Sequence, residues 1–305
     1  MSMSSRVASA LLLTLVLAAG ASAQSLVVVS ADAGAPVMRV HPETGATRTI
    51  AFAGAPEPLQ VGTLDPSSRR VFFVRDATLT AFDLDRHTQQ RIPYPYAAGL
   101  PWLVWDESSQ RLLSVADWPI RVISIDPHSG DSTTLLTLDT NDSGILWGKQ
   151  AFDPAGRRLF FMIGNNDPER LAVVDLTTRQ YQTVVLTGTG HWFLRYDPTS
   201  ARILTYGNSK SCKPEIRAID PANGQEEVLA PVPPGLDATI NTSAYDEQAR
   251  RLFYVTFADA GLRIVTFDVE TRTFSSVPFP SRTGNLPVFE FLQRAKIARE
   301  TRPRD

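Results

Sequence analysis

Short apolar runs bounded by polar turn residues recur along the chain, with almost no 3.6-residue helical periodicity between them. Residues 71–74 (VFFV), 159–162 (LFFM) and 252–255 (LFYV) are examples, and Asp, Pro, Gly or Asn residues stand between such runs. Apolar runs of about four residues between turn residues are typical of β-strands. The pattern therefore predicts an all-β fold.

A repeated motif organises these runs. An Asp is followed five residues later by an Arg and then by a largely apolar four-residue run, and a second Asp follows about twenty residues after the first. Successive copies are 41 to 49 residues apart, which is the period of a propeller blade with four antiparallel strands. The five first Asp residues and their Arg partners are Asp65 and Arg70, Asp106 and Arg111, Asp153 and Arg158, Asp197 and Arg202, and Asp246 and Arg251.

The number of repeats predicts a six-bladed propeller. Five units are complete, and a sixth copy of the second motif at residues 38–45 follows the apolar run 26–29 but lacks an inner strand. The apolar run 285–292 can supply that strand, so the C-terminal strand would join the N-terminal blade and close the ring. We expect one domain over residues 24–293, followed by a polar, basic tail over residues 294–305.

The N-terminus has the pattern of a cleaved secretory signal. Arg6 precedes an apolar run over residues 8–20, and the small residues Ala21, Ser22 and Ala23 follow it. The run is too short to span a bilayer comfortably, and no later segment reaches 18 uninterrupted apolar residues. We expect cleavage after Ala23, a periplasmic or secreted location, and no membrane span in the mature chain.

Composition narrows the classes of function. Thirty Lys and Arg residues balance 32 Asp and Glu residues, which argues against nucleic acid as a partner. Hydrophobic residues form 43% of the chain, enough for a sizeable core, and the single cysteine excludes an internal disulfide framework or a multi-cysteine zinc site. We expect a monomer that closes by β-pairing.

The repeated Asp and Arg residues predict a scaffold. An Asp at a tight turn accepts backbone N–H groups, and an Arg five residues later can pair with it across the hairpin. The aromatic residues just before these Asp residues, Trp105, Phe152, Tyr196 and Tyr245, are expected to pack between neighbouring blades.

Candidate functional residues lie where the repeat is irregular, in the loops at the end opposite the Asp turns. His191 opens a strand near the expected channel mouth, where it could act as a general base or a metal ligand. We identify no metal site and predict no cofactor, although Asp, Asn and Glu side chains on separate blades could hold a divalent cation. The ligand-binding candidates are Trp118, Lys149, Asn165, Asn166, Trp192, Asn208, Asp237, Asn241 and Glu290.

The repeat units resemble those of the broad YVTN/NHL-type propeller superfamily, which includes lactonase-like, gluconolactonase-like and Tol-system propellers. The resemblance is carried by residues 152–161 (FDPAGRRLFF) and residues 171–178 (LAVVDLTT). It implies the fold and no active site, because these are scaffold residues.

Two functions remain open from the sequence. The favoured one is a binding or scaffolding module for a protein, peptide or glycan of the cell envelope, since catalytic motifs are absent and the irregular loops carry Pro and Trp. The alternative is a lactonase-type or gluconolactonase-like hydrolase with His191, Asn241 and Glu290 around the channel. The sequence does not decide whether the chain is an enzyme, and the absence of catalytic motifs favours a protein that is not one.

Overall fold

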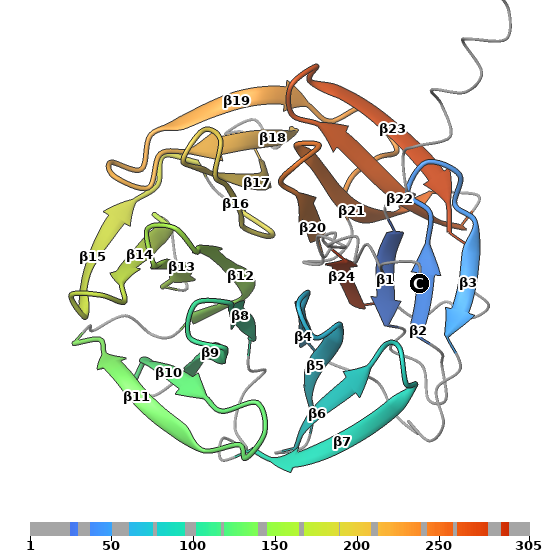
Figure 1. Cartoon of the computed structure of the whole chain (residues 1–305). Coiled ribbons are helices and arrows are strands. Elements are labelled where there is room, and N and C mark those ends of the chain that lie inside the picture. The colour runs from blue at the N-terminus through green and yellow to red at the C-terminus, as the bar shows by residue number, and fades with distance from the viewer. Residues whose placement is uncertain are drawn as a thin grey trace, which may run out of the picture.

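The computed structural model describes residues 25–29, 37–50, 61–75, 78–94, 102–116, 119–139, 145–164, 168–188, 190–208, 213–238, 243–258, 261–279 and 288–292. All regular structure in these ranges is β, and the strands pair into four-stranded antiparallel sheets around a common axis (Figure 1). No helix suited to crossing a bilayer is found in the described part of the chain. The predicted all-β propeller is confirmed.

The described strands form six sheets, numbered I to VI here by the position of their second strand along the chain. Sheet I contains β24 (Val288–Leu292), β1 (Ser25–Val29), β2 (Val37–Val40) and β3 (Thr47–Ile50). Sheet II contains β4 (Val61–Asp65), β5 (Arg70–Arg75), β6 (Thr78–Asp83) and β7 (Thr88–Pro93). Sheet III contains β8 (Val104–Asp106), β9 (Arg111–Ala116), β10 (Arg121–Ile125) and β11 (Ser132–Thr137).

The remaining sheets follow the same order from the axis outward. Sheet IV contains β12 (Ile145–Asp153), β13 (Arg158–Ile163), β14 (Arg170–Asp175) and β15 (Gln180–Val185). Sheet V contains β16 (Arg195–Asp197), β17 (Arg202–Asn208), β18 (Pro214–Ile219) and β19 (Glu226–Pro231). Sheet VI contains β20 (Ser243–Asp246), β21 (Arg251–Ala258), β22 (Gly261–Asp268) and β23 (Thr273–Pro278).

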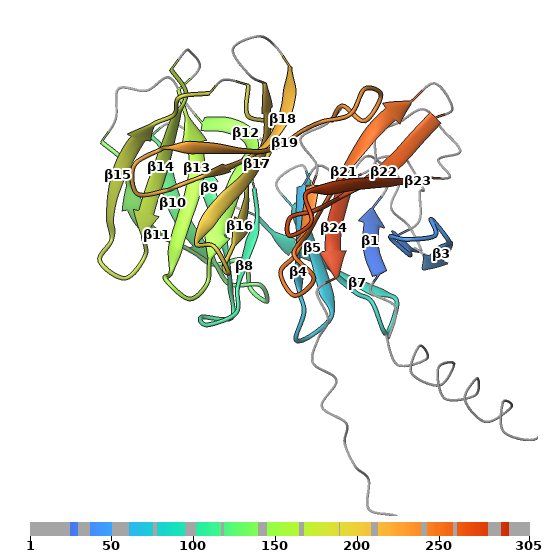
Figure 2. The same cartoon turned by 90° about the horizontal axis from the view of Figure 1, so that it is seen from above.

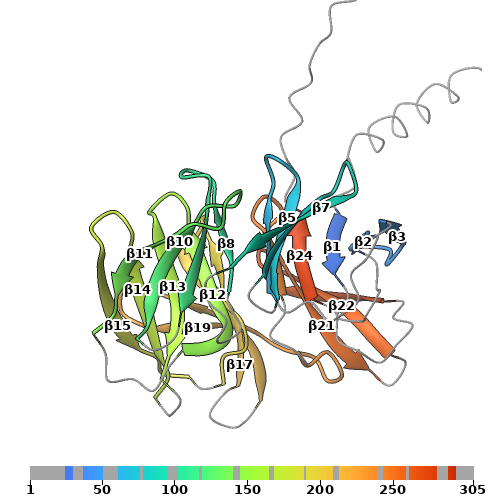
Figure 3. The same ribbon diagram turned by 90° about the horizontal axis from the view of Figure 1, so that it is seen from below.

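Sheet I is completed by the C-terminal strand, as the sequence predicts. β24 pairs antiparallel with β1, with Ser25 opposite Leu292 and Val27 opposite Glu290. Figure 3 shows β24, β1, β2 and β3 in this order from the axis outward. In the edge-on view β24 lies next to β4 of sheet II, with which it is in contact (Figure 2). Strands from the two ends of the chain therefore share one sheet.

The core lies between neighbouring sheets. Its buried clusters join sheets II and III, III and IV, IV and V, V and VI, and VI and I. Aromatic residues contribute to these contacts between sheets. Trp105 of sheet III stacks on Phe72 of sheet II at a ring distance of 5.8 Å, and Tyr196 of sheet V stacks on Phe160 of sheet IV at 5.7 Å. The predicted packing of the pre-Asp aromatic residues between sheets is confirmed for these two.

The repeated Asp residues are held in turns by the hydrogen bonds the sequence predicts. Asp65, for example, accepts bonds from the backbone and hydroxyl of Ser67 and from Ser68, and only 1% of it is exposed. The pairing of the repeat Arg with this Asp holds in sheet IV, where Arg158 lies 2.8 Å from Asp153. It is wrong for three repeats, whose Arg residues pair with other carboxylates. These partners are Asp126 for Arg111, Glu227 for Arg202, and both Glu43 and Asp268 for Arg251.

Two of the first Asp residues are instead paired with an Arg from the next sheet. Arg157 of sheet IV reaches Asp106 of sheet III at 2.9 Å, and Arg250 of sheet VI reaches Asp197 of sheet V at 2.8 Å. Arg157 and Arg250 both have φ of 51°, a left-handed turn conformation that directs the side chain out of its own hairpin. These pairs join neighbouring sheets at the end of the propeller that carries the Asp turns.

The turn between the two outer strands alternates between two types around the ring. Sheets I, III and V have a Pro at its second position and a Gly with positive φ at its fifth, namely Gly45, Gly130 and Gly224. A Cβ on any of these glycines would clash with a carbonyl oxygen of the preceding sheet's outer strand, at Pro278, Pro93 and Val185 respectively. Sheets II, IV and VI instead place His87, Arg179 and Arg272 at positive φ. The structural period is therefore two sheets.

Candidate functional site

The candidate site lies between sheets IV and V, in the segment that connects β15 to β16. The N–H of Leu186 donates to the carbonyl of Glu169 at 3.0 Å, and the N–H of Trp192 donates to the carbonyl of Tyr206 at 2.9 Å. Both ends of the segment are thereby tied to strands of the two sheets that it connects. This fixes the position of His191 between them.

His191 is fully buried and faces a carboxylate on each side of its ring. Its Nδ1 contacts Glu169 in a short hydrogen bond, and its Nε2 lies 3.3 Å from Oε2 of Glu226. The backbone N–H of His191 also donates to Glu169, at 3.2 Å. Only the imidazolium form can donate from both ring nitrogens. Burial by itself would lower the pKa of His191, but the hydrogen bonds to the two carboxylates outweigh it and raise that pKa above its ordinary value.

Arg217 extends this ionic network into sheet V. Its Nη1 donates to Glu226 at 2.8 Å, and its Nε and Nη2 both donate to one oxygen of Glu215, at 3.0 and 2.8 Å. The exposed fractions of the Arg217 and Glu226 side chains are 7% and 4%. Burial opposes ionisation of Glu226, yet the bonds from His191, Gly188 and Arg217 lower its pKa to about 2. Glu226 is therefore ionised at neutral pH.

Gly188 allows the connecting segment to approach this network. Its N–H donates to Oε1 of Glu226 at 2.6 Å. A Cβ at this position would overlap Nη1 of Arg217 and Oε2 of Glu226, so no larger residue fits without displacing the ion pair. The segment is thus held by backbone hydrogen bonds, by Gly188 and by His191 together.

Three of the sequence-predicted binding residues lie near this network or in the next loop. Trp192 follows His191, is partly buried, and meets Tyr206 edge-on at a ring distance of 6.3 Å. Asn208 ends β17 and is half-buried, and Gly190 lies beside it. Asp237 is exposed in the loop after β19, where its charge adds to the effect of burial in raising the pKa of Tyr206 to about 12. These residues gather at the junction of sheets IV, V and VI.

The other candidates are not brought together by the described structure. Lys149 belongs to β12 and Glu290 to β24, but their side chains lie outside the described parts of the chain. Trp118, Asn165, Asn166 and Asn241 lie outside the described residues altogether. Within the described ranges, no group of three or more His, Cys, Asp or Glu side chains is placed to hold a metal ion.

Three residues of the network were not predicted from the sequence: Glu169 and Glu226, which contact the ring of His191, and Arg217, which pairs with Glu226. One signal was present. Arg217 is three residues before the second Asp of its repeat, where the other complete repeats have an uncharged residue: Thr80, Ile123, Ala172 and Val265. A charged residue at a position that is otherwise apolar or small indicates a buried ion pair. The two glutamates carried no comparable signal.

No protein-family model matches this chain, and no curated protein matches it in sequence. Solved structures do match its fold. A chain of a nidogen/laminin complex superimposes with a TM-score of 0.68 at 13% identity, over 89% of this chain and 99% of that one. TolB from Acinetobacter baumannii superimposes with a TM-score of 0.68 at 13% identity, over 88% of this chain and 67% of TolB. A putative TolB from Agrobacterium tumefaciens superimposes with a TM-score of 0.60 at 10% identity, over 83% of this chain and 88% of that protein.

These matches show the class of fold: the chain is a β-propeller, as are TolB and the matched chain of the nidogen/laminin complex. At identities of 10 to 13% the likeness extends to the fold and not to a ligand or an activity.

Proposed function

We propose that the chain is an extracytoplasmic propeller that binds a protein, peptide or glycan of the cell envelope through the end that carries the His191 segment. The observation that supports this proposal best is the burial of His191 between two carboxylates, next to a partly buried Trp192. Such a network holds a loop in one conformation. A preorganised loop beside an aromatic residue is a suitable binding surface, because little conformational entropy is lost on association.

The same observation argues against the lactonase-type alternative with His191 as its general base. A general base must come within hydrogen-bond reach of the substrate proton. The imidazole of His191 has no exposed surface, and both of its ring nitrogens already face carboxylates.

The proposal includes a six-bladed ring and a cleaved leader. The six described sheets, the contacts of β24 with both β4 and β20, and the two-sheet alternation of turns support an even-numbered closed ring. Sheet I begins at Ser25, so cleavage after Ala23 would leave it whole. We place the mature protein, a monomer, in the periplasm or outside the cell, and the TolB propellers and the nidogen/laminin complex are precedents for the fold only.

The test is capture from envelope extract of the source bacterium, quantified by mass spectrometry, with the mature chain immobilised. We expect a partner whose capture is lost with Trp192→Ala and kept with Thr134→Ala, a control change at an exposed position on the outer strand of sheet III. Equal capture by both variants would place the binding surface elsewhere. Turnover of a lactone panel with Ca²⁺ or Zn²⁺, lost in His191→Gln, would overturn the binding role in favour of the hydrolase.

A further inference from the structure

The repeat arginine of sheet II differs from its four counterparts. A terminal amino group of each counterpart donates to an oxygen of the described structure; the acceptors are the carbonyl of Asp131 for Arg111, and carboxylates of Asp153 for Arg158, Glu227 for Arg202 and Glu43 for Arg251. Arg70 donates only from Nε, to Ser68 at 2.9 Å, and its nearest carboxylate, Asp65, is 4.0 Å from Nη2. Among the described residues, its terminal amino groups therefore have no hydrogen-bond acceptor.

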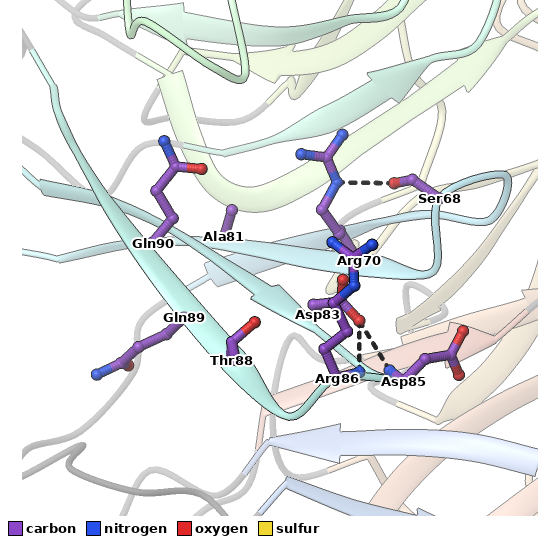
Figure 4. A pocket seen from close by; sticks show the side chains of 9 residues that line it. All are labelled: Ser68, Arg70, Ala81, Asp83, Asp85, Arg86, Thr88, Gln89 and Gln90. Carbon is purple, nitrogen blue, oxygen red and sulfur yellow. Dashed lines mark hydrogen bonds between the residues drawn. The ribbon is translucent and has the colours of Figure 1, made fainter.

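Arg70 lines a cavity of about 470 Å³ on the face of sheet II that packs against sheet III. Figure 4 shows Arg70 and Gln90 on either side of Ala81, which leaves the space between them open. Arg86 lines the same cavity, and Thr88 contributes a hydroxyl group. The cavity therefore has guanidinium, amide and hydroxyl hydrogen-bond donors around the small side chain of Ala81.

A second cavity on sheet VI is lined by residues equivalent in strand register to those of the sheet II cavity, and its arginine has a carboxylate partner. Its volume is about 210 Å³, and Arg251, Asp268 and Thr273 stand where Arg70, Asp83 and Thr88 stand in sheet II. It is also lined by Pro42 and Glu43 from the turn of sheet I. Nη1 of Arg251 donates to the carboxylate of Glu43 at 3.1 Å. The chain thus pairs the arginine of this cavity with one of its own glutamates.

The turn of sheet III packs on sheet II in the same way but has no carboxylate at the position of Glu43. Gly45 packs against the carbonyl of Pro278 and Gly130 against that of Pro93, so the two turns occupy equivalent positions. Counting back from these glycines, the position of Glu43 is taken by His128, which is exposed. The cavity of sheet II is consequently larger, and its arginine is left without the glutamate.

We propose that the cavity between Arg70 and Gln90 binds the carboxylate of a glutamate or aspartate side chain from a partner peptide. A peptide is the expected source because the equivalent arginine, Arg251, is paired with a glutamate in a Pro-Glu turn. Asp83 and Asp85 also line the cavity, but an oxygen of Asp83 accepts two backbone N–H groups and both oxygens of Asp85 accept from Arg69. The matching Asp268 does not prevent Glu43 from binding Arg251. A charge-assisted bond to a guanidinium supplies the affinity. This site lies at the end with the Asp turns and does not depend on the proposed function of the His191 segment.

The experiment is a titration of the ¹⁵N-labelled mature chain with N-acetylglutamate amide, observed at the arginine Nε–Hε signals. We expect saturable shifts of the Arg70 signal, no shift of the Arg158 signal, and no effect of N-acetylglutamine amide. Arg70→Gln removes this reporter and is followed at the backbone amide signals of Thr88 and Gln90, where binding should be about tenfold weaker or more, as expected for loss of a charge-assisted hydrogen bond. Arg158→Gln should leave binding unchanged. Equal shifts at Arg70 and Arg158, or equal effects of the glutamine compound, would overturn the proposal.

Two further arms keep the test decisive. His128→Glu changes an exposed residue and places a carboxylate where Glu43 lies in the other cavity, so it should abolish binding of N-acetylglutamate amide even if Arg70→Gln does not fold. If His128→Glu bound N-acetylglutamate amide as the wild type does, the proposed position of the ligand carboxylate beside Arg70 would be overturned. Titration with glucuronate distinguishes a sugar acid from a peptide, and saturation at a lower concentration than for the glutamate compound would overturn the peptide assignment.

Discussion

Oε2 of Glu226 lies 3.3 Å from Nε2 of His191, so the outermost strand of sheet V is linked to the segment that leads into its innermost strand. Glu226→Gln should destabilise the protein by about 3 kcal/mol, because it removes one partner of a buried charged network and leaves Arg217 and His191 undercompensated. Urea unfolding followed by circular dichroism measures this loss. The matched control is Glu227→Gln, at an exposed neighbouring position, which should cost about 1 kcal/mol or less. Equal losses for the two variants would contradict a special role of the buried network.

The contribution of His191 to stability should depend on pH. Its pKa is raised in the folded state, so its contribution is fully present below the ordinary histidine pKa of about 6.5 and is lost as the pH rises through the folded value. The Glu226 pKa is lowered to about 2, so its contribution is present above its ordinary value and is lost as the pH falls toward 2. The difference in unfolding free energy between the wild type and His191→Gln should therefore be largest near pH 5–6 and shrink in alkaline solution. A difference that grows above pH 7 would contradict this assignment.

Gly188→Ala should be destabilising although it adds one methyl group. The new Cβ would overlap the guanidinium of Arg217 and the carboxylate of Glu226, and relieving that overlap separates the ion pair. Overpacking of this kind costs about 1–3 kcal/mol. Gln182→Ala, at an exposed position on β15 without a contact to this network, is the control and should change stability by about 0.5 kcal/mol or less. Thermal unfolding of the two variants beside the wild type gives the comparison.

Gln110→Arg should stabilise the protein by adding an ionic link between sheets II and III of the kind made by Arg157 and Arg250. Gln110 of sheet III has φ of 55°, the conformation of Arg157 and Arg250, which reach the Asp of the preceding sheet. The equivalent Asp of sheet II, Asp65, is almost fully buried and held by serine hydroxyls as Asp106 is. A partly exposed pair of this kind contributes about 0.5–1 kcal/mol. Denaturant unfolding should show the gain, and Asp65→Asn should abolish it in a double-mutant cycle.

The sequence predicts the propeller well because its determinants are local. An Asp turn followed by an apolar run specifies a hairpin from neighbouring residues, and repetition at a fixed period places each hairpin in a sheet. The pairing of β24 with β1 was predictable for a related reason, since one repeat lacked a strand and only one apolar run was unused. The alternation between glycine turns and turns with His87, Arg179 or Arg272 was also visible in the sequence once alternate repeats are compared.

The candidate site was less predictable because its contacts are not local. His191 was identified from its position in the repeat, but Glu169 and Glu226 lie 22 and 35 residues from it, on opposite sides along the chain. The partner of a long side chain also depends on other sheets, since Asp106 is paired with Arg157 of sheet IV while Arg111 pairs with Asp126. The open cavity at Arg70 depends on what a different sheet fails to provide, and a single repeat does not contain that information.

The pairing of β24 with β1 has a consequence for where the polypeptide can be interrupted. Ser25 and Leu292 are partners in one ladder, so the first and last described residues lie about one strand spacing, 4.8 Å, apart. A short peptide linker could join them, and new chain ends could then be opened in an exposed turn such as residues 176–179 of sheet IV. The circularly permuted chain would form the same sheets with its termini at a different place, so the packed structure does not require the termini to lie in sheet I.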